Sequence, residues 1–265
     1  MNVRLVPSST ALASPRRSPL AFCVLVFALS LPLWLIGWVA GVELFPGLPL
    51  AALMVVCPAV AALILVYRET SVAAAVAFAK HALDHKGIHP GWYAPIFLLM
   101  PGVVLASYGL LRPMGTPLPV PNVSAAVALV MIVLFFAGAI CEEIGWSGYA
   151  TEPLQERFGA LRAGLLLGAI WAVWHFVPLL EAHRSPAWIA WWSLFTVALR
   201  VLIVWIYNNT GKSVFAAALF HAASNACTVL LPIEFEIVGP ALAVVAAFVI
   251  VVWGPRTLIR PGKLE

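Results

Sequence analysis

Charged residues are scarce in this chain of 265 residues. Asp, Glu, Lys and Arg together make up only 10% of it, whereas 63% of its residues are hydrophobic. A soluble domain of this size cannot bury so much apolar surface in its core, so the composition excludes a water-soluble globular protein. The mean hydropathy of +1.01 indicates that lipid surrounds most of the chain.

The chain also has few cysteines and few clusters of charged residues in its sequence. The 4 cysteines lie in or beside apolar stretches without CxxC spacing, and the chain has no HExxH string, so two common zinc-site patterns are absent. The net charge of +4 comes from basic residues scattered singly between apolar runs. Because nucleic-acid binding needs basic residues gathered into a patch, we expect no nucleic-acid partner.

Long apolar runs, by contrast, follow one another along most of the chain. A membrane-spanning helix needs about 20 apolar residues, and runs of that length predict about eight spans. The runs cover residues 20–42, 48–67, 92–111, 123–146, 162–180, 187–207, 213–231 and 236–254. The first run is too long for a removed signal peptide and lacks a small-residue cleavage site. We therefore predict an all-α, polytopic bundle of transmembrane helices, with an interfacial helix in the segment 68–91.

The distribution of Lys and Arg agrees with this topology. An even number of spans puts both termini on one side, and the basic residues should gather on the cytoplasmic side. One side carries only Arg112 and Arg184. The other carries Arg4, Arg16, Arg17, Arg68, Lys80, Lys86, Arg157, Arg162, Lys212, Arg256, Arg260 and Lys263. Both termini are thus expected in the cytoplasm, and Arg200 is left inside the sixth span.

Polar groups at membrane depth are candidates for a functional site, because a charged group inside a bilayer is costly. These groups are Glu142, Glu143, His175, Arg200, His221 and Asn225. Adjacent helical residues differ by about 100° in direction, so the two glutamates should have different partners. Residues four apart share one helix face, as His221 and Asn225 do, and as Trp171 and His175 do. Two Glu, two His and one Asn on three helices are hard to explain as packing, so we expect them to converge.

Two stretches carry a resemblance to a known family. An EExxxR-like motif and an FxxxH-like motif lie in the run CEEIGWSGYATEPLQERFGALRAGLLLGAIWAVWHFVP, and an HxxxN motif lies in the run WIYNNTGKSVFAAALFHAASNA. Their order resembles the CPBP family of intramembrane peptidases, which includes CAAX-prenyl endopeptidases and bacteriocin-processing, Abi-type proteins. The resemblance covers residues 125–231. Residues 1–120 resemble the family only in being hydrophobic spans. Together with the apolar runs, the resemblance divides the chain into a cytoplasmic tail at 1–19, N-terminal spans at 20–120, a catalytic membrane domain at 121–235, and a last span with a basic tail at 236–265.

The resemblance implies an endopeptidase that cleaves a membrane-associated protein or peptide, either CAAX-type or in peptide maturation. Glu142 and His175 would activate a water molecule, while His221 and Asn225 would bind the oxyanion, with no cofactor. Hydrolysis needs a base, a group that orients water and donors for the developing oxyanion, and these side chains supply them. Glu143 would be a supporting residue that holds either the helix or a neighbouring histidine through a hydrogen bond. The Ala-rich and Pro-rich composition favours a bacterial inner membrane.

Two positions depart from the family's motifs. Ser147 stands at the arginine position, four residues after Glu143, so an ion pair within that helix cannot form. We hypothesise that Arg200 supplies the missing charge, which would also explain why a membrane helix tolerates it. Trp171 replaces the family's Phe and keeps an aromatic wall.

Other interpretations stay open at this point. Zn²⁺ could bind Glu142, His175 and His221 and keep a fourth position open for water. The string GWSG at 145–148 would make Ser147 a serine nucleophile with His221 as its base, although a small packing residue is the simpler account. A catalytically silent relative would act as a membrane scaffold or as a regulator of another membrane protein. A transporter is disfavoured because the chain has no inverted repeat.

Overall fold

The structure, a computed structural model, describes residues 17–45, 48–114, 123–231 and 234–260. Arg4, Arg16 and Lys263, which contribute to the predicted topology, lie outside the described residues, as does most of the predicted tail 1–19.

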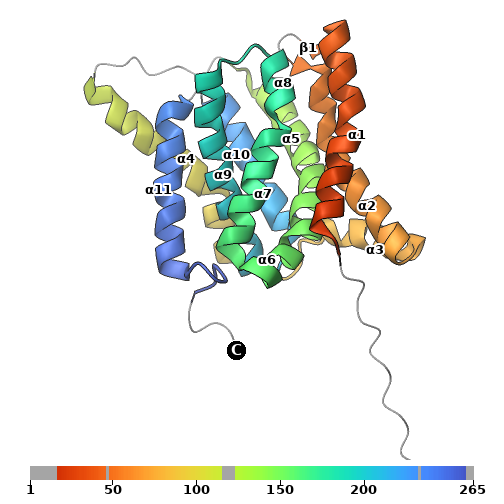
Figure 1. Ribbon diagram of the computed structural model, residues 1–265. Helices are drawn as coiled ribbons and strands as arrows, with labels where there is room; N and C mark the ends of the chain where they lie inside the picture. The colour runs from red at the N-terminus through yellow and green to blue at the C-terminus, as the bar shows by residue number, and fades with distance from the viewer. Residues whose placement is uncertain (1–16, 46–47, 115–122, 232–233, 261–265) are drawn as a thin grey trace, which may run out of the picture.

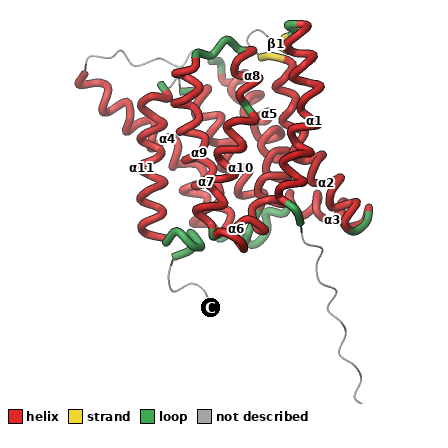
Figure 2. Tube along the Cα trace, in the orientation of Figure 1, coloured by secondary structure: helices red, strands yellow, loops and turns green. Residues whose placement is uncertain are grey.

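Helices make up nearly all of the described chain, in agreement with the predicted all-α class (Figures 1 and 2). In chain order the elements are α1 (Pro19–Ala40), β1 (Glu43–Phe45), β2 (Leu48–Pro49), η1 (Leu50–Val56), α2 (Cys57–Glu69), α3 (Val72–Ala82), η2 (Pro90–Trp92), α4 (Tyr93–Leu111), η3 (Arg112–Met114), α5 (Ala125–Gly145), η4 (Trp146–Thr151), α6 (Glu152–Phe158), α7 (Ala160–Trp174), α8 (Phe176–Glu181), α9 (Pro186–Asn209), α10 (Val214–Leu230) and α11 (Phe235–Trp253). The strands β1 and β2 form a small antiparallel hairpin after α1, which the apolar pattern did not predict.

Six helical segments of the described chain are long and apolar enough to cross a membrane: Pro19–Ala40, Leu50–Glu69, Pro90–Leu111, Ala125–Phe158, Pro186–Asn209 and Phe235–Trp253. The chain is therefore a multi-pass membrane protein. Helices α7 and α10 coincide with the other two predicted spans, but they have only 15 and 17 residues, so eight crossings stay a prediction. The start of α1 and the end of α11 lie at the same edge of the bundle (Figure 1), as an even number of crossings requires.

Serine residues define the starts of five helices. Each serine side chain accepts a hydrogen bond from the backbone N–H three residues later, which satisfies a donor that the helix itself leaves unpaired. The capping residues are Ser18 for α1, Ser71 for α3, Ser124 for α5, Ser185 for α9 and Ser213 for α10. The helix boundaries thus follow from local sequence, while their mutual packing depends on the faces that they present.

The outward faces of the long helices are apolar, as lipid requires. Leu20 on α1 is 76% exposed, Val39 on the same helix 83% and Val251 on α11 82%. In a water-soluble protein such side chains would form a large exposed patch, whereas in a bilayer they meet hydrocarbon. Helix α3 has mostly exposed residues and lies across the edge of the bundle (Figure 1), which agrees with the predicted interfacial helix.

Helix α9 is the centre of the bundle, and small residues let its neighbour α7 approach it. The most apolar window of α9 is 67% buried. A Cβ added at Gly168 would lie 3.0 Å from the Cα of Val197 and 3.1 Å from the Cβ of Arg200, and one at Gly164 would lie 3.3 Å from the Cα of Val201. Two glycines one turn apart therefore give α7 its close contact with α9, as small residues commonly do between membrane helices.

The structure corrects two predicted spans. The span 123–146 does not end at residue 146, because the helix continues through the π-helical segment η4 and α6 to Phe158. Pro153 lies in the first turn of α6 and does not end the helix. The span 162–180 is not one helix, because it breaks at His175 between α7 and α8. Pro178 in α8 has no N–H to donate to the carbonyl of Trp174, four residues earlier, and its ring would clash with that carbonyl in a regular helix.

Candidate active site

The carboxylate of Glu143 is the centre of a fully buried polar cluster. Its Oε2 lies 2.7 Å from Nη1 of Arg200 on α9, and its Oε1 lies 3.0 Å from Nδ1 of His221 on α10. Ser147, one turn further along the helix, donates its hydroxyl hydrogen to the same Oε2. Because the guanidinium holds this carboxylate ionised, Nδ1 of His221 is the donor, and Nε2 is the ring atom left for other partners.

Arg200 is placed as the sequence hypothesis requires. Its side chain is 0% exposed, it forms an ion pair with Glu143, and its guanidinium carbon lies 4.2 Å from the ring centre of Trp171. The ion pair between Glu143 on α5 and Arg200 on α9 thus takes the place of an ion pair within one helix, which cannot form because Ser147 stands at the arginine position of the motif. Ser147 is more than the small packing residue suggested by the sequence, because its hydroxyl supports the same carboxylate.

Glu142 has a different and smaller set of partners, as the angular offset of the two glutamates predicts. Its side chain is 4% exposed, and its Oε2 accepts a hydrogen bond of 2.6 Å from Nε1 of Trp171. Its other oxygen, Oε1, makes no hydrogen bond within the described part of the chain. One oxygen of Glu142 is therefore fixed in place while the other can accept a proton.

His175 lies at the junction of α7 and α8, and its ring is 5.6 Å from the ring of Trp171, the residue that binds Glu142. Its Nδ1 donates to the backbone carbonyl of Trp171 over 2.8 Å, which leaves Nε2 as an acceptor. Its ring packs edge-on against Trp174 and is tilted against Trp192, with centroid separations of 4.7 and 5.2 Å. Trp171 thus links both groups, since its side chain holds Glu142 and its carbonyl orients His175.

Asn225 is the one predicted site residue that the structure does not connect to the others. It lies one turn after His221 on α10 and is partly buried, and its amide makes no hydrogen bond to any residue that the structure describes. As a residue four positions after His221, it lies on the same face of α10.

The two other chemistries raised by the sequence fit these contacts less well. Ser147 is 0% exposed and its hydroxyl is bound to Glu143, so it is poorly placed to act as a nucleophile. Across the described ranges, no group of three His, Cys, Asp or Glu side chains is arranged to hold a metal ion. Nδ1 of His221, one member of the hypothetical zinc set, is hydrogen-bonded to Glu143.

The contacts that hold η4 were not predicted from the sequence. Nη1 of Arg17, just before α1, donates to the carbonyl oxygen of Gly148 over 2.7 Å. The hydroxyl of Tyr149 donates to Oε1 of Glu69 at the end of α2 over 2.5 Å. No periodic pattern signals these pairs, because they join segments that are distant in the sequence and depend on a local π-helix.

Comparison with known proteins finds one family model and one curated relative that are similar to this region of the chain. A model of the type II CAAX prenyl endopeptidase Rce1-like family matches residues 124–227. The CAAX prenyl protease 2 of Methanococcus maripaludis is 31% identical over 152 residues, covering 52% of this chain and 56% of that protein. The chain thus spans about half the length of the curated relative that it matches. The residues that the family model matches include both glutamates, both histidines, Arg200 and Asn225, so this region of the chain is similar to the Rce1-like CAAX prenyl endopeptidases.

Proposed function

We propose that this protein is an intramembrane endopeptidase in which Glu142 is the general base. The observation that carries the proposal is that the two neighbouring carboxylates have different numbers of hydrogen-bond and ion-pair partners. Glu143 is occupied by Arg200, His221 and Ser147, whereas Glu142 is held by one hydrogen bond and keeps an oxygen free. A base must be both oriented and able to accept a proton, and Glu142 meets both conditions.

In the proposed reaction, each of the remaining groups has one role. A water held between Glu142 and Nε2 of His175 attacks the carbonyl carbon of the peptide bond and gives its proton to Glu142. The carbonyl electrons move to the oxygen, which accepts hydrogen bonds from His221 and Asn225. As the C–N bond breaks, the proton passes from Glu142 to the leaving nitrogen, and a carboxylic acid, which keeps the second proton of the water, and an amine are released.

Glu143 and Arg200 act through His221. Because Nδ1 of His221 donates to Glu143, its Nε2 can donate to the oxyanion only when the ring is an imidazolium. The two carboxylates of Glu142 and Glu143 balance the charges of such an imidazolium and of the Arg200 guanidinium. The buried cluster is then neutral overall, which is the state that a low-dielectric environment favours.

For the substrate, we propose a membrane-associated protein or peptide in a bacterial inner membrane. The name of the Methanococcus maripaludis relative points to CAAX tails of prenylated proteins. The family that the sequence motifs resemble also includes bacteriocin-processing proteins. Cleavage of a prenylated CAAX peptide, compared with the same peptide without its lipid, separates these two substrate classes.

The decisive experiment is cleavage of a quenched-fluorescent peptide library by the purified protein in detergent. We expect Glu142→Gln, His175→Ala and His221→Ala each to lower the rate by at least about 100-fold. Glu156→Gln is the matched control, because Glu156 is an exposed glutamate on the same continuous helix, and its loss should change the rate by no more than about twofold.

Two outcomes would overturn parts of the proposal. Loss of activity on addition of a chelator, with recovery on addition of Zn²⁺, would replace the metal-free mechanism by a zinc-dependent one. A folded wild-type protein that cleaves neither lipidated nor lipid-free peptides would refute the peptidase assignment and favour the silent scaffold or regulator.

A further inference from the structure

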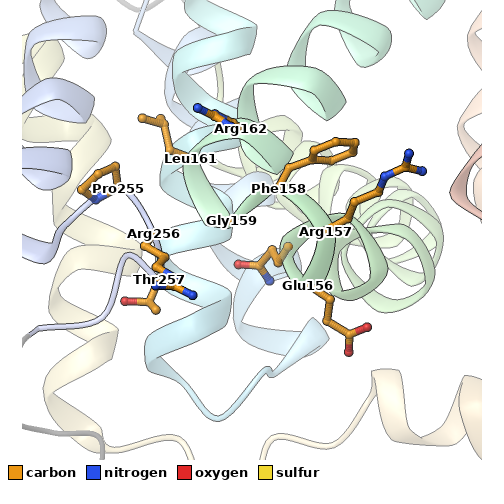
Figure 3. A pocket seen from close by; sticks show the side chains of 10 residues that line it. Glu156, Arg157, Phe158, Gly159, Leu161, Arg162, Pro255, Arg256 and Thr257 are labelled. Carbon is orange, nitrogen blue, oxygen red and sulfur yellow. The ribbon is translucent and has the colours of Figure 1, made fainter.

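A pocket of about 720 Å³ lies away from the glutamates, where α6, α7 and the segment after α11 meet (Figure 3). It is at the edge of the bundle where α11 ends and α7 begins (Figure 1), the same edge to which most basic residues are assigned by the sequence. A pocket at the ends of membrane-spanning helices lies at the level of the lipid headgroups.

The walls of this pocket are fixed by hydrogen bonds between segments distant in the sequence. The first backbone N–H groups of α7, at Ala160 and Leu161, donate to the carbonyl oxygens of Arg256 and Pro255 over 2.8 and 3.0 Å. Nδ2 of Asn208 on α9 donates both to the Gln155 side chain and to the carbonyl of Thr257, over 2.6 and 2.8 Å. The segment after α11 is therefore tied to α6, α7 and α9.

A glycine makes this close arrangement possible. Gly159 joins α6 to α7 with a φ of 81°, a conformation that other residues rarely adopt. A Cβ at this position would also lie only 3.2 Å from the carbonyl oxygen of Arg256.

Three arginines line the pocket, each from a different segment. Arg157 lies at the end of α6, Arg162 in the first turn of α7 and Arg256 after α11, around the turn at Gly159 (Figure 3). All three are exposed, and none forms an ion pair with any carboxylate that the structure describes. Glu156 is the one acidic residue among those that line the pocket. The hydrogen-bond donors left for a ligand are thus chiefly guanidinium groups.

We propose that this pocket binds the phosphate group of an anionic membrane phospholipid. Guanidinium groups match phosphate oxygens in geometry and charge, and basic pockets between helices at the cytoplasmic face suit lipid headgroups. The volume exceeds what inorganic phosphate needs and leaves room for the rest of a headgroup. The proposal does not depend on the peptidase activity, because the pocket residues are separate from the buried cluster around Glu143.

The test compares two triple variants with equal loss of charge. One is Arg157→Gln/Arg162→Gln/Arg256→Gln in the pocket. The control is Arg68→Gln/Lys80→Gln/Lys86→Gln, three exposed basic residues on the same side of the predicted topology that do not line the pocket. Phosphatidylglycerol, phosphatidylcholine or inorganic phosphate is titrated into each protein in neutral detergent. Bound copies are counted by native mass spectrometry, and thermal unfolding confirms that each variant is folded.

We expect the wild type and the control to retain one phosphatidylglycerol with similar affinity, and the pocket variant to bind it on the order of 100-fold more weakly, about fivefold for each arginine. Equal weakening in both triple variants would overturn the proposal, because binding would then reflect only the overall charge of that side. Equal affinity for phosphatidylcholine would overturn it as well. Inorganic phosphate that binds as tightly as the lipid, and displaces it, would reject a lipid as the source of the phosphate.

Discussion

Replacing Arg200 by leucine should destabilise the protein and impair its activity. Arg200 and Glu143 are both 0% exposed and lie 2.7 Å apart, so the variant leaves a carboxylate buried without its cation. Breaking a buried ion pair in this way costs about 3–5 kcal/mol. Glu143 also holds His221, and loss of such a supporting contact lowers the rate by about 10- to 100-fold.

The measurement is thermal unfolding in detergent together with peptide cleavage at a temperature where all variants stay folded. Arg184→Leu is the matched control, because Arg184 is exposed and lies over the ring of Trp188 at 4.8 Å, outside the buried cluster. The double variant Ser147→Arg/Arg200→Leu returns a cation one turn after Glu143 and should recover at least about tenfold of the lost rate. An Arg200→Leu protein as stable and as active as the wild type would refute the reasoning.

Three further predictions concern neighbouring contacts. Trp171→Phe keeps the aromatic ring but removes the donor to Glu142, so the cleavage rate should fall by roughly tenfold or more, and an unchanged rate would show that this hydrogen bond does not position the base. Gly168→Ala should lower the stability by about 1–3 kcal/mol in thermal unfolding, because its Cβ would press on the backbone of α9, whereas Gly102→Ala, with nothing within 4 Å, should not lower it. Ser147→Ala removes one hydrogen bond from the buried ion pair and should cost about 0.5–1.5 kcal/mol, and a loss of all activity in a stable protein would instead support a serine nucleophile.

The membrane-embedded helices could be predicted from the sequence because hydropathy reports directly on the solvent of each segment. The breaks were harder to predict. The helix interruption at His175 falls inside an uninterrupted apolar run, and Pro178 was the only local sign of it. The continuation of α5 through η4 into α6 also escaped the apolar pattern, because the polar residues after 151 favour a loop when only hydropathy is considered.

The sequence allowed us to predict which residues form the buried cluster, but not most of the contacts between them. A lone arginine inside a membrane helix must have a partner, which is why Arg200 could be assigned to Glu143 before the fold was known. The partner of Glu142 could not be assigned in the same way. Trp171 was expected to form an aromatic wall, but its role as a donor depends on how closely α7 approaches α5 and α9, and that distance is set by three-dimensional packing.

The π-helical segment η4 has a consequence for how the sequence can vary. A π-helical turn holds one more residue than an α-helical turn, so it rotates the helix after it by about 100° relative to the helix before it. The direction in which α6 presents Arg157 is therefore set separately from the direction in which α5 presents Glu142. Deleting a single residue between 146 and 151 would restore a regular α-helix and rotate α6 relative to α5. The sequences of α5 and α6 would stay the same, but their side chains would point in different relative directions. The extra residue of η4 thus sets the direction in which side chains point in the interfacial part of this long helix, relative to those in its buried part.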